Sequence, residues 1–169
     1  MAYTYSKIAT YTVGSGGVAS IDFLNIPQTY TDLVIKVSSR DTSAFNYRDL
    51  RIGFNGVTTN LSGRILYGEA GVVGSYSVAT GLVAWDNSAN STANTFSNVE
   101  YYIPNYAGSN NKSFSVDSVT ENNATAVITN ISAGLWSSLS AITQINLSPL
   151  TGTFVQYTTA HLYGVKAEL

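Results

Sequence analysis

Apolar and polar residues alternate along most of the chain, a pattern typical of half-buried antiparallel strands. β-Branched and aromatic residues recur at every second position, and clusters of Gly, Asn, Ser and Pro separate the alternating stretches. A helical period is nearly missing. We therefore predict an all-β chain of about ten strands. The clearest of them cover residues 8–13, 18–23, 31–39, 49–54, 98–103, 112–120, 125–134, 141–147, 153–158 and 160–167.

Glycine and asparagine mark the predicted turns. The GSGG stretch at 14–17 is free to adopt positive φ, so we expect it to join the first two strands in a hairpin. Asn55-Gly56 is the strongest two-residue hairpin signal, because a type I′ turn needs positive φ at both positions, and Val57 would begin its return strand. In residues 62–85, five glycines predict short strands and a long ordered loop.

The segment IDFLNIPQTYTDLVIKVSSR at 21–40 is interrupted by a proline. Pro27 cannot donate to a sheet, so the NIPQTY stretch is predicted to connect two strands where the chain changes sheet or direction. In the strand that follows, alternate side chains face opposite ways. One face carries Leu33, Ile35 and Val37, and the other carries Val34 and Lys36.

The length of 169 residues suits one domain with one sizeable core. So many short strands must hide their apolar faces in a two-sheet sandwich or a closed barrel, and a jelly roll is the usual arrangement at this size. We predict that residues 1–169 form a single antiparallel, jelly-roll-like β-sandwich.

Composition narrows the classes of partner. Charged residues make up 11% of the chain and the net charge is −2, so the surface must be mostly neutral and polar. This balance gives no attraction to phosphate backbones or anionic lipid, and we expect neither nucleic acid nor membrane as a partner. A weak net charge favours packing against other protein subunits. With no cysteine, no signal-like start and no long apolar run, the chain is expected to stay in a cytoplasm or to leave by lysis.

Candidate chemistry is sparse, and we predict no catalytic, cofactor-binding or metal-binding residue. His161 is the only histidine and lies in a predicted strand, and no G-x-S-x-G motif occurs. The carboxylates fall mostly beside turns, without the facing pair that a glycosidase needs. Asp117 and Glu121 could approach a cation with the Asn122-Asn123 turn, but no calcium-type loop is present. GSGG lacks the helix and lysine of a phosphate-binding loop.

Aromatic residues suit interfaces or sugar stacking. The chain has 12 Tyr, 6 Phe and 2 Trp, and tyrosine combines an apolar ring with a hydroxyl group. Most are expected in the core or in cross-strand pairs, with Trp136 in the core. Tyr3 and Tyr5, ahead of the first predicted strand, are candidates for contact with a neighbouring subunit, although a terminal segment pairing at a sheet edge is the alternative.

Several segments carry a resemblance to a known family. They are KIATYTVGSGGVASIDFLNIPQTYTDLVIKVSSR at 7–40, FNG at 54–56, NY at 105–106, Trp136 with Ile142 and Ile145, and LYGVKA at 162–167. In these segments the chain resembles small virion structural proteins of tailed bacteriophages, especially phages of cyanobacteria and other aquatic bacteria. The resemblance spans nearly the whole chain. It implies a structural protein of the phage particle, and for some relatives a jelly-roll capsid decoration (cement) protein.

The leading hypothesis is thus a non-enzymatic decoration protein on the outer surface of the head, made in the bacterial host cytoplasm. Its expected partners are the major capsid protein and further copies of itself as a homotrimer, with loops 40–47 and 86–94 projecting or docking. A tail, neck or fibre component that joins virion parts or binds host glycans is the alternative. An enzyme such as a glycan hydrolase is a third reading, which would need a carboxylate pair.

Overall fold

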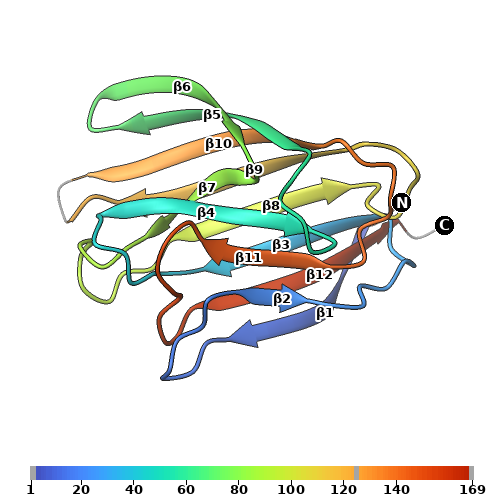
Figure 1. The fold of residues 1–169 in the computed structure, drawn as a ribbon, viewed down its shortest axis with the longest axis horizontal. Coiled ribbons are helices and arrows are strands. Elements are labelled where there is room, and N and C mark those ends of the chain that lie inside the picture. The colour runs from blue at the N-terminus through green and yellow to red at the C-terminus, as the bar shows by residue number, and fades with distance from the viewer. Residues whose placement is uncertain (1–2, 124–125, 168–169) are drawn as a thin grey trace.

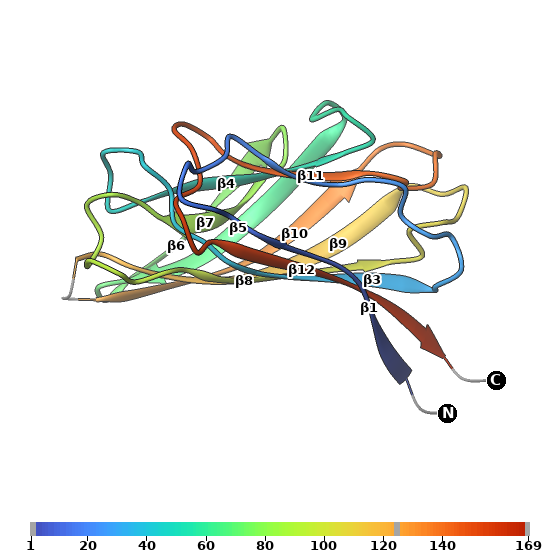
Figure 2. The same ribbon diagram turned by 90° about the horizontal axis from the view of Figure 1, so that it is seen from below.

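The computed structural model describes residues 3–123 and 126–167 (Figure 1). This part of the chain forms twelve strands and no helix, in two antiparallel sheets that pack face to face (Figure 2). The large sheet contains, in spatial order, β1 (Tyr3–Thr12), β12 (Thr159–Ala167), β3 (Asp32–Ser38), β8 (Asn98–Pro104), β9 (Lys112–Glu121), β10 (Val127–Trp136), β5 (Leu61–Glu69) and β6 (Val72–Ala79). The small sheet contains β2 (Ile21–Phe23), β11 (Ile145–Pro149), β4 (Tyr47–Phe54) and β7 (Leu82–Asn87).

The strand order is that of a jelly roll extended by two hairpins. Without the β5–β6 and β9–β10 hairpins, the sheets read β1-β12-β3-β8 and β2-β11-β4-β7, and consecutive strands alternate between them. Eight strands wound in this way are the jelly-roll arrangement. Both hairpins add to the same edge, beside β8, and so make the large sheet twice as wide as the small one. The predicted fold class is confirmed.

The core lies between the sheets and follows from the period-two pattern. β9 and β10 alternate buried and exposed residues along almost their whole length, because successive side chains point to opposite faces. Trp136 is in this core, as predicted. Large buried side chains in this core include Leu33, Ile35, Ile52, Phe54, Ile103, Phe114, Trp136, Leu147 and Leu162.

The segment around Pro27 connects the two layers, as its sequence predicts. β2 belongs to the small sheet and β3 to the large sheet, so the chain changes sheet between them. The Pro27 carbonyl accepts a hydrogen bond from the Tyr106 hydroxyl, and Ile26 is buried beside it. The connection therefore packs against the core and covers it between the two sheets.

The hairpin predicted at 14–17 is wrong. β1 pairs with β12 and β2 pairs with β11, so the glycine turn carries the chain from one sheet to the other. The residue after the turn, Val18, exchanges both backbone hydrogen bonds with Phe154. Residues 153–158, predicted as a strand, contribute only bridges at Phe154. A Cβ at Gly17 would lie 2.7 Å from the Phe154 carbonyl oxygen, so this close approach needs glycine.

The turn at Asn55-Gly56 is confirmed, but its return strand is not. Asn55 and Gly56 have φ of 51° and 77°, and Phe54 exchanges backbone hydrogen bonds with Val57. The ladder stops there, because β4 is already paired with β11 on one side and β7 on the other. No edge of β4 is left for a hairpin partner, so the chain crosses to the large sheet and begins β5.

The long loop predicted within 62–85 is also wrong, since β5, β6 and β7 run through it with tight turns between them. Ala70-Gly71 and Thr80-Gly81 have positive φ and form these turns. Gly74 lies within β6, where a Cβ would stand 2.7 Å from the Tyr67 hydroxyl. That glycine therefore makes room for a side chain that crosses the strand, rather than ending it.

Candidate functional sites

The catalytic triad considered from the sequence is not assembled around His161. The ring lies on the outer face of β12, with Nδ1 3.1 Å from the Thr10 hydroxyl oxygen. In the described part of the chain no carboxylate contacts the ring to orient it, as a catalytic triad requires. His161 is a strand histidine with one hydroxyl partner.

Asp117 and Glu121 do not converge on a cation either. The Glu121 carboxylate accepts hydrogen bonds from the Thr92 backbone N–H and hydroxyl and from the Thr95 hydroxyl. Asp117 lies four residues earlier on β9, facing solvent. Within residues 3–123 and 126–167, no three His, Asp or Glu side chains gather as metal ligands would.

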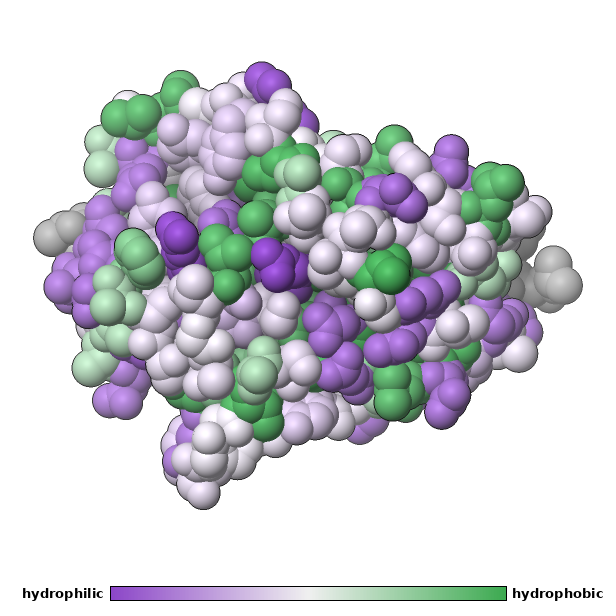
Figure 3. Space-filling model, viewed as in Figure 1, coloured by the Kyte–Doolittle hydropathy of each residue, from purple (hydrophilic) through white to green (hydrophobic). Residues whose placement is uncertain are grey.

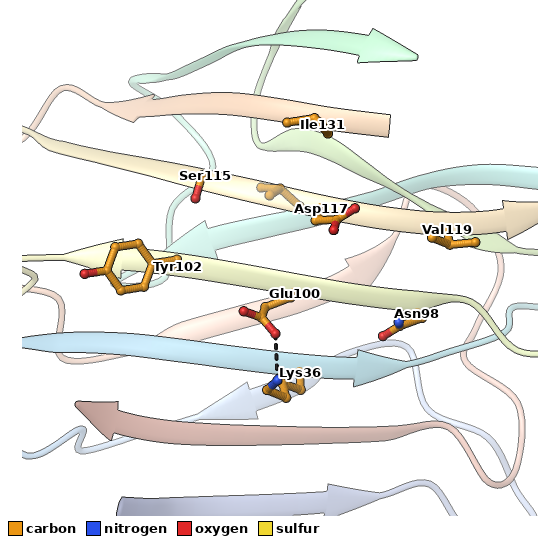
Figure 4. A pocket seen from close by; sticks show the side chains of 9 residues that line it. Lys36, Asn98, Glu100, Tyr102, Ser115, Asp117, Val119 and Ile131 are labelled. Atoms are coloured by element: carbon orange, nitrogen blue, oxygen red, sulfur yellow. Dashed lines mark ion pairs between the residues drawn. The ribbon is translucent and has the colours of Figure 1, made fainter. Parts of the chain in front are cut away.

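The outer face of the large sheet has a hollow of about 450 Å³, which we call the sheet-face hollow (Figure 4). Four strands line it, and its side chains follow the antiparallel register. In one row Lys36, Glu100, Asp117, Ile131 and Leu66 lie opposite one another, on β3, β8, β9, β10 and β5. This row changes from charged to aliphatic as it crosses the sheet.

The aliphatic end of this row is exposed. Ile131 and Leu66 have 64% and 59% of their surface accessible, and they lie directly opposite each other on β10 and β5. Val119, also exposed, is a diagonal neighbour of Ile131. We call Leu66, Val119 and Ile131 the apolar stripe. On the face of the small sheet, by contrast, apolar side chains are scattered singly among polar ones (Figure 3).

The charged end carries an ion pair and an unbalanced carboxylate. Lys36 Nζ lies 2.7 Å from Glu100 Oε2, and this contact raises the pKa of Lys36. Asp117 lies opposite Glu100 in the register, where like charges repel. The pair is half exposed, so it adds little to folding stability. Arg64, two residues before Leu66 on β5, is a further exposed charge on this face and donates to the Ser77 and Ser75 hydroxyls.

A second hollow, of about 290 Å³, opens where the β5–β6 hairpin meets the small sheet. We call it the tyrosine pocket. Four strands, β4, β5, β6 and β7, supply its walls. Its lining consists of Tyr47, Arg48, Asp49, Tyr67, Glu69, Tyr76 and Trp85.

Trp85 forms the buried base of this pocket, and the tyrosines pack around it. Its ring centroid lies 5.1 Å from that of Tyr47, 5.4 Å from that of Tyr67 and 6.5 Å from that of Tyr76, which stacks on it. Two hydrogen bonds fix the polar edges. The Tyr47 hydroxyl donates to Glu69 Oε2 at 2.8 Å, and Trp85 Nε1 donates to the Tyr76 oxygen at 3.2 Å.

Burial raises the pKa of three ionisable groups in the tyrosine pocket. It raises the pKa of Tyr47, and the neighbouring Glu69 carboxylate raises it further, so this hydroxyl keeps its proton and remains a donor. Burial also raises the pKa of Tyr76 and of Asp49, the latter opposed by nearby Arg48. The pocket therefore presents tyrosine hydroxyls beside two carboxyl groups.

The sequence does not predict the tyrosine pocket, because its residues are spread over four strands. Tyr67, Glu69 and Tyr76 come from the segment for which the glycine pattern predicts short strands and a long ordered loop. The alternation of Tyr67 and Glu69 on β5 is the signal that could have placed them on one face. Their partners on β4 and β7 follow only from the fold.

Tyr3 and Tyr5 belong to β1, which starts earlier than the prediction. Tyr3 pairs with Ala167 in the backbone register, and Tyr5 packs edge-to-face on Tyr163 with ring centroids 6.4 Å apart. Tyr5 is more than half exposed. The ends of β1 and β12 near the termini extend past the packed layers (Figure 2). Contact of either tyrosine with a neighbour stays a prediction.

Loops 40–47 and 86–94 pack on each other. The backbone N–H groups of Ala89 and Asn90 donate to the Ser43 and Phe45 carbonyls. Beneath them, the fully buried Asp86 accepts hydrogen bonds from the hydroxyls of Ser39 at 2.8 Å and Ser97 at 3.0 Å. The two segments thus form one hydrogen-bonded unit. Whether this unit projects from the particle or docks on the capsid stays a prediction.

Comparison of the chain with protein-family models, with curated proteins and with solved structures found no match. The described residues include no helix of the length and apolarity needed to cross a lipid bilayer. What the fold and sites define is therefore a jelly-roll β-sandwich with an apolar stripe on its wide face and a polar tyrosine pocket at its edge.

Proposed function

We propose that the protein is a non-enzymatic structural component of a tailed-phage particle, a decoration protein on the outer surface of the capsid. The observation that carries the proposal is the apolar stripe. Leu66, Val119 and Ile131 lie together on the outer face of the large sheet. Contiguous exposed apolar side chains on a polar protein mark a contact with another protein. The sequence resemblance to virion proteins supplies the identity of that partner.

The wide face of the large sheet is the surface that we place against the major capsid protein. It offers eight strands of surface, whereas the small sheet offers four. The edge strand β6 is also largely exposed, without proline or charge to block pairing with another strand. Each copy would add a modest interface, and the symmetry of the shell would repeat it many times. The function needs no chemistry, only binding to the assembled head, which stabilises it by mass action.

Head binding by a stripe variant tests this proposal. Replacing Leu66 and Ile131 together by threonine keeps strand propensity but removes aliphatic surface, so we expect binding to undecorated heads to weaken by about tenfold or more. Co-sedimentation with purified heads measures it. Leu24→Thr is the matched control, since Leu24 is an exposed leucine away from the stripe. Equal binding by the double variant and the control would contradict the proposal.

A tail, neck or fibre component is the second candidate, favoured by the tyrosine pocket. A cluster of tyrosine hydroxyls and carboxyl groups suits recognition of a glycan, which a host-contacting part of the virion requires. The location of the protein in the particle separates the two candidates.

A further inference from the structure

We infer that the tyrosine pocket binds a neutral saccharide. This inference is independent of where the protein sits in a particle, because it rests on the pocket alone. The pocket is a hollow of about 290 Å³, just below the range of roughly 300–1,000 Å³ for small-molecule sites. A space of this size fits one or two sugar rings.

The pocket is built before any ligand arrives. Its side chains stand on four strands of the sandwich, and Trp85 is held by three packed tyrosine rings. The Tyr47–Glu69 and Trp85–Tyr76 hydrogen bonds fix the polar edges of the walls. Groups that are already positioned lose little conformational entropy on binding, so even a weakly binding sugar can be held.

Donors and acceptors in the pocket match the hydroxyl groups of a sugar. Glu69 uses Oε2 to accept from Tyr47, while Oε1 has no partner among the described residues and can accept from a ligand hydroxyl. The Tyr76 oxygen accepts from Trp85, which leaves its own proton to donate. The Arg48 guanidinium lies over the Phe45 ring, 4.4 Å from its centroid, so it is not counted among these groups. A sugar hydroxyl both donates and accepts, and so complements this mixture.

The charged groups of the tyrosine pocket indicate whether its ligand is neutral or ionic. The Asp49 and Glu69 carboxyl groups are matched by Arg48 in the lining and by Arg51, which is near enough to lower the pKa of Asp49, so the pocket has no excess positive charge to attract an acidic sugar or a phosphate. An organic cation would need free aromatic faces. The Trp85 face is covered by the stacked Tyr76, and only 5% of Trp85 is exposed. A neutral polyhydroxyl ligand is the class that remains.

The pair of carboxyl groups raises the question of hydrolysis. A glycosidase needs one carboxyl group as acid and a second as base or nucleophile on either side of the glycosidic bond. Glu69 is held by the Tyr47 hydroxyl, which suits a binding role for this carboxylate. We therefore assign the pocket to binding, and the experiment includes a measurement of hydrolysis.

The test uses the full chain on an array of neutral, acidic and choline-bearing glycans, followed by titration of bound neutral glycans while Trp fluorescence is recorded. We expect binding to neutral glycans, weakened about tenfold by Glu69→Gln and by Tyr76→Phe, each of which alters a pocket hydrogen-bonding group. Matched controls are Glu100→Gln and Tyr5→Phe, whose side chains lie on the outer face of the large sheet. The control variants should bind like the parent.

Four results would overturn the inference. They are no binding to any neutral glycan, binding that neither pocket variant changes, a preference for acidic or choline-bearing glycans, and release of reducing sugar from a bound oligosaccharide. Circular dichroism of each variant shows whether it is folded, so a loss of binding is not confused with unfolding. Because head binding is measured separately with the stripe variant, failure of this inference leaves the proposed capsid role to its own test.

Discussion

Asp86 is a fully buried carboxyl group at the junction of loops 40–47 and 86–94. Its pKa is raised to about 8, mainly by burial and also by the neighbouring Asp41 carboxylate, while the hydroxyl groups of Ser39 and Ser97 oppose the shift. In the unfolded chain the same group titrates near 3.8. The native state therefore keeps a proton that the unfolded state has lost.

This difference predicts a pH dependence of stability. Between about pH 4 and pH 8 the native state binds more protons than the unfolded state, so the free energy of unfolding falls as pH rises, by at most about 1.4 kcal/mol per pH unit. Asp86→Asn removes the titrating group and should flatten this slope. Thermal unfolding at pH 5 and pH 8 measures it, with Asp117→Asn, an exposed carboxylate, as the control. An unchanged slope in Asp86→Asn would show that Asp86 is not the group responsible.

At the scale of elements, β9 and β10 pack so closely at one point that only glycine fits there. Gly134 on β10 lies under the ring of Phe114, its register partner on β9, and a Cβ there would enter that ring. Phe114 in turn packs edge-to-face on Phe54, with ring centroids 5.5 Å apart, and Phe54 packs on Trp136. The two sheets are joined through this aromatic group.

Gly134→Ala should accordingly destabilise the fold, by about 1–3 kcal/mol, because the core must shift to admit one methyl group. Gly68→Ala on β5 is the matched control: its Cβ would meet only Thr129 Cγ2, at an ordinary 3.8 Å. We expect that variant to change stability by less than about 1 kcal/mol. Urea denaturation of both variants gives the comparison. Similar losses in the two would argue against the packing described for Phe114.

Strands with strict alternation could be predicted from the sequence, and their partners could not. β9 and β10 were placed because period two directly reports which face is buried. The turn at 14–17 was assigned to a hairpin because a local signal says nothing about distant strands, and β1 pairs instead with β12 near the far end of the chain. Asn55-Gly56 forms its turn yet extends no ladder, since β4 has both edges occupied.

At the scale of the whole molecule, the two-sheet sandwich follows from the number of alternating strands and the need to bury one face of each. The unequal width of the sheets does not follow, because it depends on where the β5–β6 and β9–β10 hairpins attach. That attachment creates both sites. It places Leu66 opposite Ile131 on the wide face, and it brings Tyr67 and Tyr76 against Trp85 at the edge.

The low charge of the chain is consistent with this division of surfaces. With 11% charged residues, the protein has few groups to keep copies or partners apart, which suits a subunit that functions in an assembly. The apolar stripe would be covered by the capsid, and the tyrosine pocket on the edge would stay open to solvent. The homotrimer remains a prediction of the sequence resemblance.

The most direct test of the proposed function is the copy number of this chain relative to the major capsid protein in purified particles, measured by quantitative mass spectrometry. A decoration protein on the head predicts a ratio near one to one or a simple fraction of it. A ratio of a few per cent would contradict the capsid role and place the protein in a tail or fibre, and absence from the particle would remove it from the virion altogether.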